Sequence, residues 1–134
     1  MANASRELPK KNSVESGIYQ KKFVTLQKSL IMNTQIFEQI RQLKRRIMPN
    51  EKVILFGSQA RGDARPDSDW DLLIVLNKLE EELSDYENFA YPFVEFGCYN
   101  GAEINPKLYT KAEWEQGRAF PFYKNVMREG IEIN

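Results

Sequence analysis

Two short apolar segments, each joined to a distinctive polar pair, constrain this chain more than any other feature of its sequence. The first, residues 53–56, is rich in strand-forming side chains and stops at Gly57-Ser58. The second, residues 72–76, follows Asp69-Trp70-Asp71 and is apolar at every position, which is typical of a central strand covered on both faces. The sequence therefore predicts two strands whose polar ends lie next to each other.

Apolar spacing and capping signals predict the other elements around these strands. Ile36, Ile40, Leu43 and Ile47 fall on one stripe of a helix that begins at Asn33 or Thr34 and ends at Pro49. The remaining predicted elements are a helix over residues 79–93 that Pro92 kinks or ends, a strand over 102–109, a helix opened by the capping box Thr110–Glu113, a helix over 120–129 and a terminal strand or tail over 131–133.

The first 31 residues differ from the rest of the chain. They show no sustained periodicity and contain six basic and two acidic residues. We predict a flexible N-terminal extension over residues 1–31, with at most a short helix near residues 19–30, followed by one domain over residues 32–134. The domain is expected to fold without the extension.

Composition excludes several classes of protein. The 134 residues contain 19 Lys and Arg against 19 Asp and Glu, a balance that argues against a nucleic-acid coat or a membrane-surface protein. One cysteine, Cys98, and the absence of histidine rule out a disulfide within the chain, a Cys/His zinc site and catalysis by a histidine base. No spanning segment or signal peptide is recognisable, so we expect a cytoplasmic protein.

The polar pairs predict a particular chemistry. Asp69 and Asp71 are two residues apart on a strand, so their carboxylates point to the same face and can hold Mg²⁺ together with phosphate oxygens. Gly57 allows a phosphate to approach the backbone, and a helix beginning at Ser58 offers free amide groups to it. Asp-rich turns are also ordinary loop chemistry, but the fixed spacing between two strands favours phosphoryl or nucleotidyl transfer.

Gly57-Ser58, ten residues and then Asp69-x-Asp71 resemble the signature of the DNA polymerase beta-like nucleotidyltransferase superfamily. The embedded segment 60–69 and the closing segment 121–130 look most like its minimal, single-domain prokaryotic members, which are often encoded beside a HEPN-domain protein as toxin–antitoxin pairs. The similarity covers about residues 34–134. It implies an α+β fold, a small mixed β-sheet flanked by helices on one side, that carries a nucleoside triphosphate and Mg²⁺ at one edge.

The resemblance also implies roles for single residues. Gly57 and Ser58 would hold the β- and γ-phosphates, and Asp69 and Asp71 the metals. Arg61 would neutralise phosphate charge, unless a surface salt bridge with Asp63 or Asp67 holds it instead.

Active members of the superfamily usually add a third carboxylate on a later strand. Glu103 is the better candidate here for that metal-binding and proton-accepting role. A shift of the alignment would instead place Asn105, a poor metal ligand, at this position.

Two functions follow from this resemblance. The first is Mg²⁺-dependent transfer of a nucleoside monophosphate, AMP from ATP or the equivalent from another NTP, to an acceptor hydroxyl that can belong to a partner protein. The alternative is a catalytically weak, antitoxin-like subunit that neutralises a HEPN-type toxin by contact. Neither needs a membrane or nucleic acid, and both allow a homo-oligomer.

Overall fold

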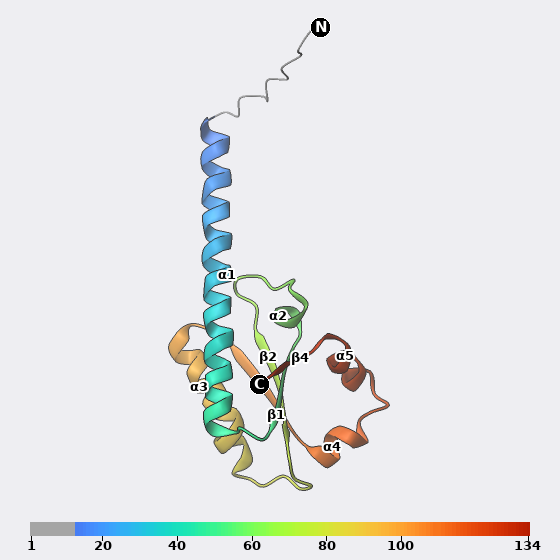
Figure 1. Cartoon of the computed structure of the whole chain (residues 1–134). Coiled ribbons are helices and arrows are strands. Elements are labelled where there is room, and N and C mark those ends of the chain that lie inside the picture. The colour runs from blue at the N-terminus through green and yellow to red at the C-terminus, as the bar shows by residue number, and fades with distance from the viewer. Residues whose placement is uncertain (1–12) are drawn as a thin grey trace. The chain divides into compact units, whose positions relative to one another are not determined.

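The computed structural model describes residues 13–134, whose centre is a four-stranded mixed sheet. The strands β1 (Lys52–Phe56), β2 (Trp70–Leu76), β3 (Ile104–Thr110) and β4 (Ile131–Ile133) lie in the order β3-β2-β1-β4 (Figure 1). β1 runs antiparallel to β2 and β4, and β2 runs parallel to β3. The α+β fold and the central position of the apolar strand β2 are therefore confirmed.

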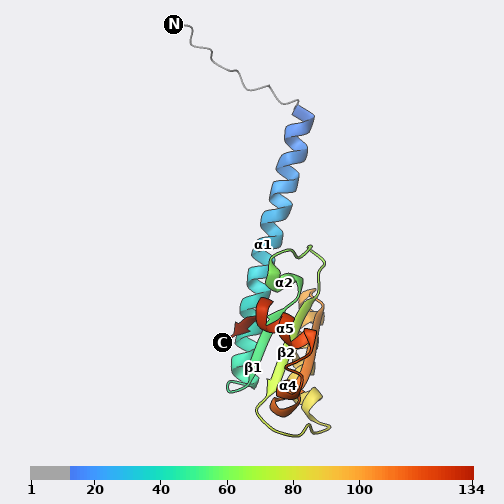
Figure 2. The same ribbon diagram turned by 90° about the vertical axis from the view of Figure 1, so that its right-hand side faces the viewer.

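Helices cover both faces of this sheet, as Figures 1 and 2 show. One face packs against the part of α1 that follows Gln35 and against α3 (Tyr91–Asn100), and the other against α4 (Lys111–Gln116) and α5 (Pro121–Glu129). Alternation along β2 separates the two cores, since Leu72 and Ile74 belong to the first and Leu73 and Val75 to the second. The expectation of helices on one side only is wrong, because the C-terminal helices bury the second face.

The first helix is much longer than the sequence predicts. α1 spans Ser13–Ile47, so neither Asn33 nor Thr34 begins it. The Thr34 hydroxyl donates to the Leu30 carbonyl at 2.9 Å, a bond within a continuing helix and not a cap. The expectation of a loosely structured segment with a short helix is therefore wrong for the helical residues from Ser13 onward, and residues 1–12 lie outside the described residues.

The chain divides by its internal contacts into residues 1–34 and residues 35–134. The predicted stripe is confirmed in the second unit, where Ile36, Ile40 and Leu43 are buried and Ile47 packs against the same core. Flexibility of residues 1–31 stays a prediction.

Deletion of residues 1–31 is expected to leave the melting temperature within about 5 °C of that of the full chain. The buried core of residues 35–134 begins at Ile36, and the truncated chain keeps the helical turns that carry the stripe. Thermal unfolding followed by circular dichroism of both chains measures the difference. A truncated protein that unfolds far earlier would show that the deleted segment docks on the domain or on a second subunit.

The connection between β2 and α3 also departs from the sequence-based prediction. Leu79 and Leu83 are exposed, and helical structure begins only with the π-helix η1 (Tyr86–Ala90). The buried Asp85 carboxylate fixes the preceding turn by accepting from the Glu82 amide and from the Lys78 ammonium group, each at 2.7 Å.

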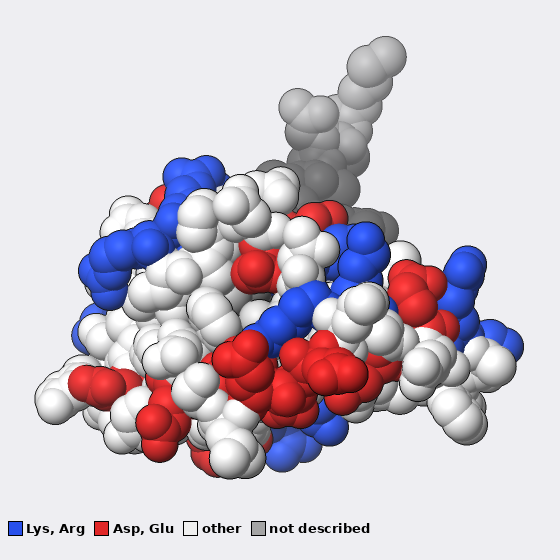
Figure 3. Space-filling view, turned by 90° about the horizontal axis from the view of Figure 1, so that it is seen from below, with Lys and Arg blue, Asp and Glu red and all other residues white. Residues whose placement is uncertain are grey.

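Pro92 lies in the first turn of α3, directly where the π-helix η1 gives way to the α-helix, so helical structure continues past it and Pro92 does not end the helix. The preceding connection is rich in exposed acidic side chains. Figure 3 views the molecule from the end at which β2 finishes, and Asp and Glu side chains gather there.

The C-terminal helices follow their sequence signals. The Thr110 hydroxyl accepts from the Glu113 amide and the Glu113 carboxylate accepts from the Thr110 amide, both at 3.1 Å, which confirms the capping box at α4. α5 ends before Gly130, and β4 confirms the predicted terminal strand. Within residues 13–134, no helix combines the length and apolar character needed to cross a membrane.

Candidate active site

The first part of the site is the turn that follows β1. Gly57 has a φ of +75°, and α2 (Ser58–Arg61) begins directly after it. The amides of Ala60 and Arg61 donate to the Gly57 carbonyl at 3.1 and 3.0 Å, so the amides of Ser58 and Gln59 precede the first bond of this turn. α2 is only four residues long, and any anion here would depend on these two amides and the Ser58 hydroxyl more than on a helix dipole.

The second part is the start of β2. Asp71 pairs with Phe56 of β1 on one side and with Asn105 of β3 on the other. Trp70 is 5% exposed and belongs to the core on the opposite face, as the alternation of the strand predicts. The turn after β1, the two aspartates and the start of β3 therefore meet at one end of the sheet.

The third part is the start of β3, where the sequence leaves Glu103 and Asn105 as alternatives. The Trp70 amide donates to the Glu103 carbonyl at 2.8 Å, and the Asn105 side-chain amide donates to the Asp69 carboxylate at 3.0 Å. The structure brings both candidates to Asp69, and Asn105 is also the register partner of Asp71.

Crowding of negative charge alters the carboxyl groups. Burial, followed by the charge of Asp69, raises the pKa of Asp71, while the charges of Lys107 and Arg61 partly lower it. The charge of Asp69 and a side-chain hydrogen bond with it raise the pKa of Glu103. These groups hold their protons more tightly than isolated carboxyls do, so a bound cation would stabilise their ionised forms.

The chemistry of these side chains fits Mg²⁺. Among the residues that the structure describes, no three or more Asp, Glu, His or Cys side chains form a group able to hold a metal ion by themselves. Two carboxylates such as Asp69 and Asp71 suffice when water and substrate phosphate complete the coordination, which is the common arrangement for Mg²⁺.

Arg61 lies in salt bridges with the carboxylates of Glu129, at 3.1 Å, and Asp63, at 3.3 Å. The charge of Arg61 nevertheless lowers the pKa of Asp71, so it stabilises the ionised carboxylate even while Arg61 is paired with Glu129 and Asp63. The sequence-based alternative of a salt bridge with Asp63 is confirmed. Contact with a phosphate stays a prediction, and it would require the guanidinium group to leave or share these carboxylates.

Lys107 is a functional candidate that the sequence analysis missed. It lies two residues after Asn105 on β3, and its charge lowers the pKa of Asp71. Its ammonium group also lies 5.2 Å from the centre of the Phe122 ring, within the range of a cation–π interaction. The period of two along a strand that links Asp69 to Asp71 would have placed Lys107 on the face of Asn105.

Gly57→Ala is expected to disrupt the site more than the fold. A Cβ atom at this position would overlap the Asp71 carboxylate, and a φ of +75° with a ψ of −157° is a conformation that only glycine adopts readily, at a cost of roughly 1–3 kcal/mol for alanine. We expect nearly complete loss of nucleotide binding, measured by calorimetry, with a drop of several degrees in melting temperature, measured by thermal unfolding. Gly62→Ala is the matched control, because Gly62 also has a left-handed φ but open space around its Cβ position. Equal loss of binding in both variants would contradict the role of the close approach to Asp71.

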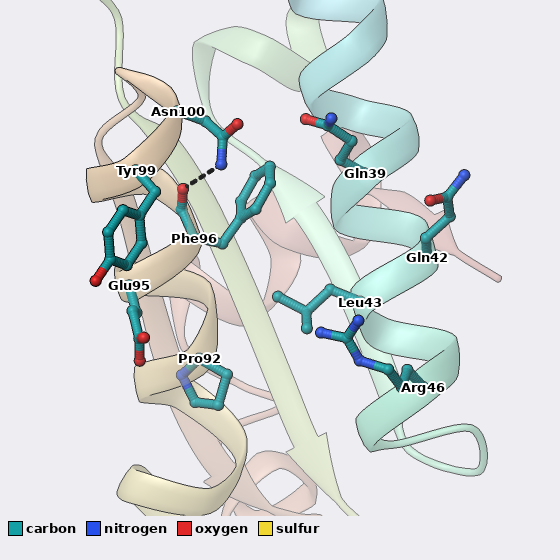
Figure 4. A pocket seen from close by; sticks show the side chains of 9 residues that line it. All are labelled: Gln39, Gln42, Leu43, Arg46, Pro92, Glu95, Phe96, Tyr99 and Asn100. Atoms are coloured by element: carbon teal, nitrogen blue, oxygen red, sulfur yellow. Dashed lines mark hydrogen bonds between the residues drawn. The ribbon is translucent and has the colours of Figure 1, made fainter.

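A separate hollow of about 460 Å³ lies between α1 and α3, on the other face of the sheet. Figure 4 shows its lining, with Arg46 on one wall and Glu95 on the other, and the Asn100 side chain bonded to the Phe96 carbonyl. None of the predicted site residues lines it. The aspartates and the turn after β1 therefore remain the candidate active site.

Comparison with known proteins gives three findings. The family model for the nucleotidyltransferase domain matches residues 34–128. A crystal structure from Sulfolobus solfataricus, described as that of a proposed nucleotidyltransferase, is similar in fold, with 19% identity, 78% of this chain and 84% of that chain covered, and a TM-score of 0.52. A toxin–antitoxin structure with AMP-PNP matches at 17% identity over 73% of this chain and 72% of that chain, with a TM-score of 0.49.

No curated protein matches the chain. The family model nevertheless covers more than half of the sequence, including the turn after β1, both aspartates and the start of β3. The resemblance seen in the sequence is thereby confirmed, and the chain belongs to the nucleotidyltransferase domain family.

Proposed function

We propose that this protein transfers a nucleoside monophosphate, AMP from ATP, to an acceptor hydroxyl in the presence of Mg²⁺. The observation that carries the proposal is the meeting of Asp69 and Asp71 with the Gly57-Ser58 turn at one end of the sheet, in a chain of this family. The acceptor oxygen forms a bond to the α-phosphorus, the bond from that phosphorus to the bridging oxygen breaks, and pyrophosphate leaves.

Each part of the site has a role in this reaction. The amides of Ser58 and Gln59 and the Ser58 hydroxyl bind the terminal phosphates. Asp69 and Asp71 would hold Mg²⁺, which supplies neutralisation of phosphate charge when bound. Glu103 takes the proton of the acceptor hydroxyl, because its carboxylate lies beside Asp69, where the acceptor oxygen must approach the metal-bound phosphate.

A labelled-nucleotide experiment tests the proposal. The protein is incubated with Mg²⁺ and ATP labelled at the α-phosphate, together with the HEPN-type protein that the sequence resemblance suggests as acceptor. Label on the acceptor and release of pyrophosphate are expected. ATP labelled at the γ-phosphate should leave the acceptor unlabelled, which separates this reaction from that of a kinase. Label from the γ-phosphate alone would contradict nucleotidyl transfer.

One observation favours a second candidate function, an antitoxin-like subunit that acts by contact. Asn105, and not a carboxylate, is the β3 residue paired with Asp71. If the protein acts by contact alone, it binds and inhibits its partner without ATP, and no label is transferred. Inhibition of the partner by the Asp71→Asn variant, measured without nucleotide, separates the two functions.

A further inference from the structure

A pocket lined by aromatic rings lies on the same face of the sheet as the aspartates. It is about 450 Å³ in volume and opens between β3 and the helices α4 and α5. The rings of Tyr109, Trp114, Phe122 and Tyr123 pack against one another with centres 4.5–6.2 Å apart. These rings form an apolar wall, against which a bound aromatic ring can pack face-on or edge-on.

Contacts connect this pocket to the site. Phe122 packs edge-on against Phe56 with centres 5.5 Å apart, and Phe56 is the register partner of Asp71. Lys107 belongs to both places, since it lines the pocket, lies over the Phe122 ring and lowers the pKa of Asp71.

The spacing along the sheet fits one ligand that reaches both places. Lys107 pairs with Leu73 and Tyr109 with Val75, two and four residues beyond Asp71 on the same face. At about 3.3 Å per residue, these levels lie about 7 and 13 Å from the aspartates. Leu73 and Val75 are themselves buried, so a ribose and a base attached to an α-phosphate at Asp71 would cover this range along the exposed side of β3, past Lys107.

An exposed aromatic ring lies at the edge of the pocket. Phe120 is 66% exposed, directly before α5. A ring bound beside it would remove part of its apolar surface from water. Phe120 lines the pocket together with the buried Trp114, so a ring bound there would cover part of both.

We propose that this aromatic pocket binds the nucleobase of the nucleoside triphosphate whose phosphates lie at Ser58 and Asp71. The inference rests on the proposed function and extends it to a base-binding subsite formed by β3, α4 and α5. Stacking on aromatic side chains accepts any base, so the pocket supplies affinity for nucleotides over inorganic phosphates.

Calorimetric titration with ATP and with inorganic tripolyphosphate, each with Mg²⁺, tests the inference. The intact protein should bind ATP more tightly than tripolyphosphate. Phe120→Ala should weaken ATP binding about tenfold and leave tripolyphosphate binding unchanged. Phe120→Tyr should keep the affinity for ATP, because it keeps the ring. Tyr99→Ala, which removes an exposed ring from α3 on the other face, is the matched control and should change neither.

The outcomes separate the two proposals. If the intact protein binds neither ligand, nucleotide transfer and the base pocket both fail. Equal binding of ATP by the intact protein and by Phe120→Ala overturns the base pocket alone, and so does equal affinity of the intact protein for ATP and tripolyphosphate. Loss of label transfer in Phe120→Ala with unchanged ATP binding also overturns it, and assigns the pocket to the acceptor.

Discussion

Asp69→Asn and Asp71→Asn are each expected to lower nucleotide transfer at least about 100-fold, as removal of one preorganised electrostatic group from an active site does. The substitutions keep the shape of the side chain and remove the charge that would hold Mg²⁺. Rates of label transfer at saturating ATP and Mg²⁺ measure the loss. Asp67→Asn is a suitable control, because Asp67 is an exposed carboxylate in the turn before β2.

The same Asp71 variant is expected to unfold at a higher temperature than the intact protein at neutral pH without Mg²⁺. Burial and Asp69 raise the pKa of Asp71 in the folded state, so its ionisation is less favourable there than in the unfolded chain. Stability from this group is present while it is protonated and is lost as the pH rises through the raised pKa. The advantage of Asp71→Asn should therefore shrink as the pH falls toward the ordinary carboxyl range.

A lower melting temperature for Asp71→Asn at neutral pH would contradict this account. It would mean that the ionised Asp71 carboxylate stabilises the folded state in the absence of a ligand. Loss of activity in this variant could then not be assigned to the metal site.

Glu103→Gln is expected to lower transfer at least about 100-fold while ATP affinity changes little. The amide keeps the size of the side chain but cannot accept the proton of the acceptor hydroxyl. Single-turnover label transfer measures the chemical step, and calorimetry measures binding. Unchanged transfer in Glu103→Gln would remove the residue from the reaction.

Asn105→Asp tests the competing position. The new carboxylate would replace a hydrogen-bond donor to Asp69 with a like charge that Mg²⁺ can neutralise, so we expect tighter Mg²⁺ binding. We expect no gain in transfer, because Glu103 already accepts the proton. A gain in transfer would show that the third carboxylate belongs at residue 105 and that Asn105 reflects a loss of catalysis. The rates of label transfer in Glu103→Gln and Asn105→Asp together distinguish an enzyme that uses Glu103 from a binding subunit without activity.

Local signals predicted the central strands well and the long-range packing poorly. Residues 53–56 and 72–76 are apolar runs bounded by glycine or aspartate, and the capping box of α4 is a contact between residues three apart. α1 continues through Asn33 although asparagine is favoured at helix starts, because a capping preference does not by itself interrupt the hydrogen bonds of a helix. The helix predicted from residue 79 begins later because the buried Asp85 fixes a turn there.

For the candidate site, too, the sequence predicted the arrangement within one strand and missed the contacts between distant segments. The spacing of Asp69 and Asp71 on one strand places both at one strand end by geometry alone. The pairing of Arg61 with Glu129 joins residues 68 positions apart, and the aromatic pocket depends on how α5 packs on β1 and β3. No local pattern encodes such contacts.

The position of β3 at the edge of the sheet has a consequence for solubility. An open edge offers unpaired backbone groups on which a strand of another molecule can add, the usual first step of β-aggregation. Because the Glu103 carbonyl accepts from Trp70, the backbone groups of residues 103, 105 and 107 face β2 and those of Pro106 face outward. Proline has no amide proton to offer there, so a foreign strand that adds to β3 loses a hydrogen bond at this position, which disfavours such addition.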